Sequence, residues 1–230
     1  MADLLEKLLH VTIAVFMAGS MLEMGLKLDL KQAGQALRDV FPDLPKEPNE
    51  VSRLPDTGTI IKLRDGRYLL ALMPASALAL RQRLANVLVP VGANAWRWLD
   101  IRSGVPLVTA ATQDQLVPQM ANFELLGGIS FDKGCYTGQE VVARMQHLGK
   151  LKRRMFLANV AAQAEAGDPL YSEDLGDQAS GIVVNAEASP DGGYDLLAAV
   201  QTASREGSTV HLKSLGGPVL RFLPLPYAPG

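Results

Sequence analysis

Apolar positions repeat with two different spacings along this chain of 230 residues. Near the N-terminus, Leu30, Ala33, Leu37 and Val40 follow the spacing of an amphipathic helix. The run "VTIAVFMAGSML" at residues 11–22 is apolar throughout, and we expect it to form a buried helix. The pattern predicts a helical leader over residues 1–44, and the proline-rich stretch "FPDLPKEPNEVSRLP" marks the end of this region.

Residues 45–154 contain both helix-like and strand-like patterns, and we expect them to form an α/β region. The two apolar runs of "TIIKLRDGRYLLAL" flank Asp65 and Gly66, which favours a β-hairpin. The segment "SALALRQRLANVL" predicts a helix with Ser76 as its N-cap. A second short helix, "NAWRWLDIRSG", is expected to end at Gly104.

Residues 155–230 contain short strand-like runs, many of them separated by Gly, Asp, Ser or Pro. This spacing is typical of a small antiparallel barrel or sandwich. The runs are "MFLANV", "GDPLYS", "ASGIVVNAEAS", "YDLLAAVQ", "STVHLKS" and "PVLRFLPL". The whole chain is therefore expected to have an α+β fold.

Composition narrows the function classes. The chain is 48% hydrophobic and 20% charged, which is a globular composition, and its net charge of −2 gives no overall basic field for DNA. A single cysteine excludes an intrachain disulfide and indicates a reducing compartment, so we expect a cytoplasmic protein. The three histidines lack metal-ligand spacing, and no metal site is expected.

The apolar run near the N-terminus is too short for a membrane span. Residues 11–22 fall short of the roughly 20 residues that cross a bilayer core. Membrane association would require residues 9–30 to insert together with Glu23 and Lys27, at a cost of about 2.5–3.5 kcal/mol for each charge at the bilayer centre.

The single cysteine, Cys135, lies in "FDKGCYTGQEVVARMQH". Lys133 precedes it and a basic run from Arg144 to Arg154 follows it, and cationic neighbours lower the pKa of a thiol. This pattern favours a functional thiolate, whereas a lone cysteine is more often a small buried side chain. The basic run is either a solvated face or a site for a polyanion, which could be nucleic-acid phosphates or a polycarboxylate tail.

Two further residue types have both a structural and a binding interpretation. Glu140 is either a first-turn glutamate of a helix or an acceptor for a heterocycle with paired N–H donors. Trp96 and Trp98 point in different directions on a helix, so one is expected in the core and the other is available for stacking on an aromatic ligand.

The motif "KGCYTGQE" at residues 133–140 resembles the signature of the YgfZ-type folate-binding, tRNA-modification-linked proteins, which are relatives of the glycine-cleavage T-protein, an aminomethyltransferase. The stretches "AWRWLDIRSGVPLV" and "VPQMANFELLGGISFDKGCYTGQEVVAR" and the strand-rich tail are similar to that family in the same order. The resemblance covers roughly residues 45–228.

This resemblance implies a folate-binding region over residues 45–154 and a C-terminal antiparallel β-barrel over residues 155–230. It implies a tetrahydrofolate ligand, a role in maintaining iron–sulfur enzymes that include tRNA-modifying ones, and such enzymes as partners. It places the functional thiol at Cys135 and makes Trp98 structural. The implied folate-binding residues are Trp96, Lys133, Gly134, Tyr136, Gly138, Gln139, Glu140 and Arg144.

The chain departs from the family before residue 45, where the first half of the folate domain and a second tryptophan are expected. Residues 15–40 instead resemble the opening of a sodium/bile-acid symporter. We therefore expect a partial folate-binding domain behind a leader foreign to the family. A folate-binding accessory protein is our first hypothesis, ahead of a folate-dependent one-carbon transferase and a membrane-associated fusion fragment.

Overall fold

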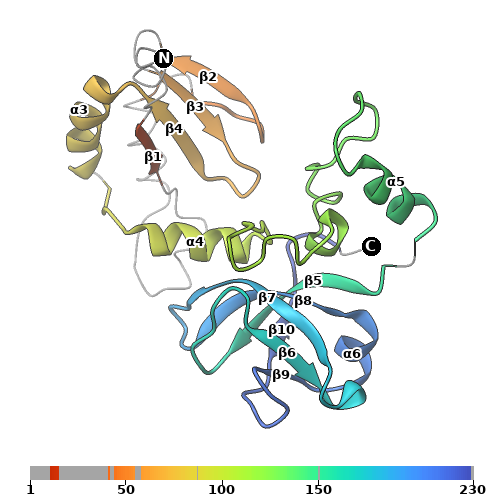
Figure 1. The fold of residues 1–230 in the computed structure, drawn as a ribbon. Helices are drawn as coiled ribbons and strands as arrows, with labels where there is room; N and C mark the ends of the chain where they lie inside the picture. The colour runs from red at the N-terminus through yellow and green to blue at the C-terminus, as the bar shows by residue number, and fades with distance from the viewer. Residues whose placement is uncertain are drawn as a thin grey trace. The chain divides into compact units, whose positions relative to one another are not determined.

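Antiparallel sheets organise both parts of the chain in the computed structural model, which describes residues 11–15, 41, 44–54, 58–86, 88–149 and 151–228. The chain divides into two units, Met1–Gly92 and Ala93–Gly230, and each contains one sheet (Figure 1). Residues 93–154 thus group with the strand-rich tail, because helix α4 (Ala93–Arg102) packs on strands of the second sheet. The predicted foreign leader stays a prediction.

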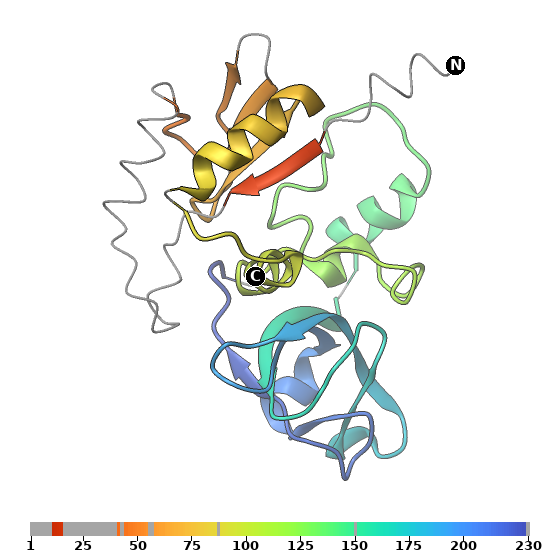
Figure 2. The ribbon, with the colours of Figure 1, turned by 90° about the vertical axis from the view of Figure 1, so that its left-hand side faces the viewer.

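The first sheet has four strands in the order β1 (Val11–Val15), β4 (Tyr68–Leu72), β3 (Gly58–Lys62) and β2 (Val51–Leu54). Helix α3 (Pro74–Ala85) covers one face of it (Figure 2). Ile60, Leu70 and Leu72 are fully buried and pack in one cluster with Ala77 and Leu84 of α3. Apolar burial between the helix and the sheet therefore holds this unit together.

The helix predicted over the N-terminal region is wrong at Val11–Val15, which form strand β1 along the edge of β4. A short apolar run does not distinguish a helix from a strand by periodicity. Here the β-branched residues Val11, Thr12, Ile13 and Val15 favour the extended form, and β4 offers a free edge. Phe41 and Leu44, at the end of the predicted leader, pack with the core cluster of this unit. The other residues of the leader and of segment 9–30, including its symporter-like part, lie outside the described residues.

Two local predictions in this unit have different outcomes. The hairpin is confirmed, since β3 and β4 are joined by a turn in which Gly66 has φ +85° and Leu63 N–H donates to Arg67 O at 2.7 Å. Ser76 is not the N-cap of α3. The helix begins at Pro74 with Met73 as its N-cap, because proline fits the first helical position, where no N–H bond is lost.

The second sheet has six antiparallel strands in the order β10-β5-β8-β7-β6-β9. All six predicted strand runs are confirmed. Their bounds are β5 (Arg153–Val160), β6 (Pro169–Ser172), β7 (Ala179–Ala188), β8 (Tyr194–Gln201), β9 (Val210–Leu212) and β10 (Arg221–Leu223). The short elements around them are η2 (Pro118–Ala121), α5 (Gln139–His147), η3 (Glu173–Leu175) and α6 (Thr202–Gly207).

The second sheet is curled, and its edge strands are linked through one segment. Leu220 N–H donates to Val210 O of β9 at 2.8 Å, and the next residues form β10, which pairs with β5. The strand order nevertheless ends at β10 and β9, so the structure gives a curled antiparallel sheet, and the predicted closed barrel stays a prediction.

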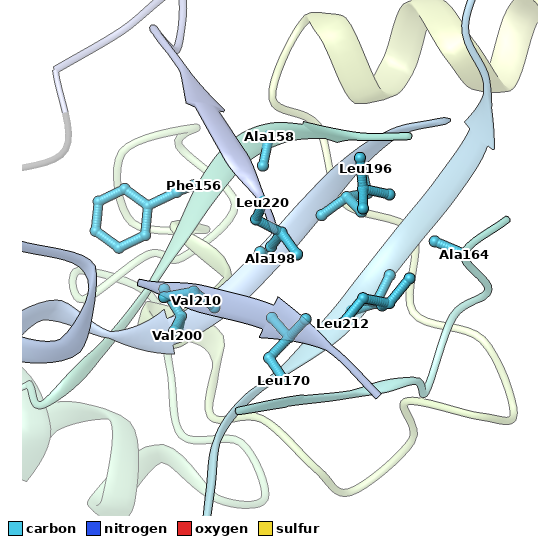
Figure 3. Close-up of a cluster of buried hydrophobic side chains, with 12 residues drawn as sticks. Phe156, Ala158, Ala164, Leu170, Leu196, Ala198, Val200, Val210, Leu212 and Leu220 are labelled. Carbon is cyan, nitrogen blue, oxygen red and sulfur yellow. The ribbon is translucent and has the colours of Figure 1, made fainter. Parts of the chain in front are cut away.

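Both faces of the second sheet are buried. On the inner face, side chains from several strands form one cluster that includes Phe156, Leu170, Leu196 and Leu212 (Figure 3). The outer face buries Met155, Leu157, Leu197 and Ala199 together with Ile101 of α4. This explains why β5 and β8 are apolar at successive positions rather than at alternate ones.

Helix α4 is anchored to the second sheet by a buried polar contact. Trp98 is 4% exposed, and its Nε1–H donates to Oδ2 of Asp195 on β8 at 2.8 Å. Asp195 is 2% exposed and also accepts from Asn159 Nδ2 at 2.8 Å. Trp98 therefore has the structural role predicted for it. None of the described helices is both long enough and apolar enough to span a bilayer.

We predict that Trp98→Phe lowers the free energy of unfolding by about 1–3 kcal/mol, because the buried carboxylate of Asp195 loses a donor. Urea unfolding followed by circular dichroism measures this change. As a control on the same helix, Arg97→Gln breaks an exposed ion pair with Glu187 and should cost less than about 1 kcal/mol. Equal, small losses in the two variants would contradict the anchoring role of Trp98.

Candidate functional site

The predicted motif forms an exposed loop that leads into helix α5. Gly138 is the N-cap of this helix and has φ +85°, a left-handed conformation that glycine adopts without strain. The side-chain oxygen of Gln139 accepts from Tyr136 N–H at 3.3 Å. The ammonium of Lys133 lies 4.8 Å from the centre of the Tyr136 ring. The structure therefore brings Lys133, Tyr136 and Gln139 together as one local unit.

The remaining predicted site residues are spread along α4, the loop and α5. Cys135 is exposed, as are Gly134 beside it and Glu140 and Arg144 on α5. Trp96 lies half-buried on α4. An exposed thiol is accessible to a ligand or a partner protein, but no described contact singles it out as a nucleophile. The binding and redox roles of these residues stay predictions.

A pocket of about 610 Å³ lies beside the C-terminal end of α5, within the second unit. Its walls come from η2 and the turn that follows it, from the end of α5, from β5 and from α6. Its polar and charged lining includes Gln119, Glu124, Arg154, Arg205 and Glu206. None of the predicted site residues lines this pocket.

A buried polar network forms the inner wall of the pocket. Arg154 pairs with Oε1 of Glu124, and the side chains of these two residues are 17% and 10% exposed. Arg154 also donates to Oδ1 of Asn122 at 3.3 Å, while Nδ2 of Asn122 donates to Met155 O at 2.8 Å. Asn122 is fully buried and has φ +58°, which asparagine tolerates better than most residues.

The hydroxyl of Tyr227 extends this network toward α4. It donates to Gly104 O at 2.7 Å and lies 3.5 Å from Nδ2 of Asn122. Gly104 ends the helical segment with φ +67°, as the sequence predicted, and a side chain there would collide with the Tyr227 ring. Burial raises the pKa of Tyr227 above its ordinary value of 10.0, and the charge of Glu124 adds to this shift.

A cation–π contact forms the outer part of the pocket wall. The guanidinium of Arg205 on α6 lies 5.0 Å from the ring centre of Phe156 and 5.7 Å from that of Phe222. Arg205 is exposed, so its charge is accessible to an anionic group. The pocket thus combines an inner wall of hydrogen-bonding groups with a cation near its mouth.

Most of the pocket was not predicted from the sequence. Gln119, Asn122 and Glu124 lie in "VPQMANFELL", where alternating polar and apolar residues are equally typical of an exposed segment. Their burial depends on contacts with Val142, Met155 and Arg154, which are distant in the chain. Only Arg154 was singled out, as part of a basic run, and its salt bridge with Glu124 explains why it does not act as a free surface charge.

Comparisons with known proteins show that the chain is similar to curated proteins and to solved structures. No protein-family model matches the chain. The chain is 34% identical over 203 residues to the "tRNA-modifying protein YgfZ" of Sodalis glossinidius (strain morsitans), which covers 86% of this chain and 62% of that protein. The chain thus spans less than two thirds of the relative's length. The predicted resemblance to YgfZ-type proteins is confirmed.

The structural comparison supports the fold. The chain is similar to the crystal structure of the glycine cleavage system aminomethyltransferase T from Bartonella henselae, with a TM-score of 0.63 and 16% identity over 84% of this chain and 57% of that one. At this identity the likeness concerns the fold alone. The mixed helix-and-sheet architecture is therefore an aminomethyltransferase-like one.

We predict that the Tyr227 hydroxyl makes stability fall at alkaline pH. Because the folded state favours the neutral phenol, its contribution is complete below pH 10.0, the ordinary pKa, and is lost as the pH rises through the higher folded pKa. Tyr227→Phe should remove this part of the pH dependence and cost about 0.5–1.5 kcal/mol at neutral pH, since the bond to Gly104 O is lost. Urea unfolding of both proteins between pH 8 and 11 measures how the free energy of unfolding changes with pH. The same pH dependence in the two proteins would contradict the role given to the Tyr227 hydroxyl.

Proposed function

Because this chain is a homologue of the tRNA-modifying protein YgfZ, we propose that it is a folate-binding accessory protein that supports tRNA modification by helping to maintain iron–sulfur enzymes. The observation that carries the proposal is the motif "KGCYTGQE" at residues 133–140. A match that covers 86% of the chain includes this motif, whichever end it leaves out. The motif and the similarity therefore support the same proposal.

The proposed ligand is tetrahydrofolate or a derivative. The aminomethyltransferase-like fold supports this choice, since the family resemblance implies folate binding on that fold. We propose binding rather than one-carbon transfer, because a likeness of fold alone does not carry catalysis. We also propose that the curled sheet closes into the predicted barrel through residues 218–223, which hydrogen-bond to β9 at one end and to β5 at the other.

The proposed partners are iron–sulfur or tRNA-modifying enzymes in the cytoplasm. The motif loop suits such an encounter, because Cys135 is exposed and a cationic residue, Lys133, lies two positions before it in the loop. A thiol can react with a partner protein, or bind a metal that the partner holds, only if the partner can reach it. The exposed loop permits this access. Cys135 is the proposed functional thiol. The proposed folate contacts are Trp96, Lys133, Gly134, Tyr136, Gly138, Gln139, Glu140 and Arg144.

We predict that tetrahydrofolate binds the full chain and that Trp96→Ala weakens binding about three- to tenfold by removing an aromatic face. Isothermal titration calorimetry under reducing, anaerobic conditions measures both affinities. Trp96→Phe keeps a ring at this position and should restore most of the affinity. Absence of heat and of a thermal shift with the wild-type chain at millimolar ligand would refute folate binding.

We predict that Cys135→Ala abolishes complementation of a strain that lacks its YgfZ-type protein, while the folded state is unaffected because Cys135 is exposed. The readout is the level of modified nucleosides in tRNA, measured by mass spectrometry. Thr137→Ala is the matched control, since it is an exposed substitution in the same loop. Full complementation by Cys135→Ala would remove the thiol from the proposal, and failure of the wild-type chain would refute the accessory role.

A further inference from the structure

Helix α5 exposes two aliphatic side chains on one face. Val141 in its first turn is 52% exposed, and Leu148, the C-cap of the helix, is 83% exposed. The Leu148 N–H donates to Arg144 O at 2.9 Å, so the helical bonding pattern continues to Leu148. Because seven residues are close to two turns of a helix, the side chains of Val141 and Leu148 lie on the same face.

The contacts of α5 with the rest of its unit use other directions around the helix. Val142 is buried, and Gln146 lines the pocket described above. At about 100° per residue, Val142 is turned by about 100° from Val141, and Gln146 by about 160° from Leu148. Neither exposed residue lines the pocket. The packing of α5 and the pocket therefore do not account for the aliphatic face.

Cations accompany this face. Arg144 is exposed and lies three residues after Val141 and four before Leu148, which places it on the same side of the helix. Lys152 is exposed shortly after the helix. The sequence has no Asp or Glu from Val141 to Arg153, although the whole chain has a net charge of −2. Within the described ranges, no ion pair involves Arg144 or Lys152.

The chemistry of this face selects a protein partner over a nucleic acid. Single-stranded nucleic acids are bound through phosphate contacts and through stacking of their bases on aromatic rings. Val141 and Leu148 offer no aromatic ring, and they are stabilised when an apolar surface removes them from water. Exposed aliphatic residues at positions i and i+7 are the anchors by which a helix binds in an apolar groove, and the neighbouring cations complement carboxylates at the border of such a groove.

The motif loop is attached to the same helix. The ring of Phe131, just before the motif, packs edge-on against His147 in the last turn of α5, with ring centres 5.9 Å apart. The chain between these two residues, which carries the exposed Cys135, is thus closed onto α5. A protein that binds the helix therefore meets a unit that also presents the thiol.

We propose that the face formed by Val141, Arg144 and Leu148 docks in an apolar groove of a partner protein, whose bordering carboxylates pair with Arg144 and Lys152. That this partner is an iron–sulfur or tRNA-modifying enzyme rests on the proposed function. The docking site itself rests on the exposure, spacing and charge of these side chains.

Photo-cross-linking in cells tests the docking site on the full chain. The chain is produced in a strain that lacks its YgfZ-type protein, with p-benzoylphenylalanine in place of Leu148. Leu78 is the matched control position, because it is an exposed leucine on helix α3. We expect cross-links from position 148, and not from position 78, that mass spectrometry maps to a protein segment in which Asp and Glu outnumber Lys and Arg.

Variants then measure the affinity for the purified cross-linked protein by calorimetry. The double variant Val141→Ser, Leu148→Ser should weaken binding about tenfold or more, because both apolar anchors are truncated. Lys152→Glu should also weaken binding, and more so at low salt than at high salt. Leu78→Ser should leave the affinity unchanged. Arg144 stays wild type because it is also a proposed folate contact, and tetrahydrofolate should bind the double variant as tightly as it binds the wild-type chain.

The outcomes separate this docking site from the proposed function. Absence of a cross-link specific to position 148 overturns the docking site, and restored tRNA modification by the wild-type chain would then leave the proposed function standing. A cross-linked acidic segment whose binding the double variant weakens, without restored tRNA modification, supports the docking site and refutes the accessory role. Cross-links to RNA, or an affinity that neither the double variant nor Lys152→Glu lowers, overturn the proposal.

Discussion

The ion pair between the part-buried side chains of Arg154 and Glu124 is the interaction on which the candidate pocket depends. A charge that is 17% exposed needs a partner, and the loop after η2 supplies one in Glu124. Asn122 completes the arrangement from a left-handed backbone conformation, bonding both Arg154 and the backbone of β5. The loop is therefore fixed to the sheet by polar contacts, and the pocket is the space that these contacts keep open beside α6.

The second sheet makes this arrangement possible because it is buried on both faces. Arg154 and Phe156 line the pocket, while Met155 between them packs in the cluster beneath α4. One strand thus contributes alternately to a polar site and to a core, as the two-residue period of a strand dictates. The anchor between Trp98 and Asp195 lies on the opposite face of the sheet, and Asp195 belongs to β8, which pairs with β5 along its whole length.

Features of this structure that depend on neighbouring residues were predicted from the sequence. Features that depend on contacts between residues far apart in the chain were not. The hairpin at Gly66, the glycine turn at Gly104 that follows α4 and the six strands of the tail depend on neighbouring residues, and the sequence predicted all of them. Strand β1 was missed because its conformation is decided by β4, more than fifty residues away. The pocket was missed for the same reason, since Tyr227 and Gly104 are 123 residues apart and Asn122 and Met155 are 33 apart.

Helix α5 connects the two features that carry functional interest. Its N-terminal end follows the motif loop, and its C-terminal end lines the pocket, so its nine residues separate them by about 13 Å. Val142 at its middle is buried, and its carbonyl accepts from Gln119 in the pocket wall. Hydrogen bonds therefore tie Gln119 in the pocket wall to α5, and Gln139 in the first turn of α5 to the loop at Tyr136.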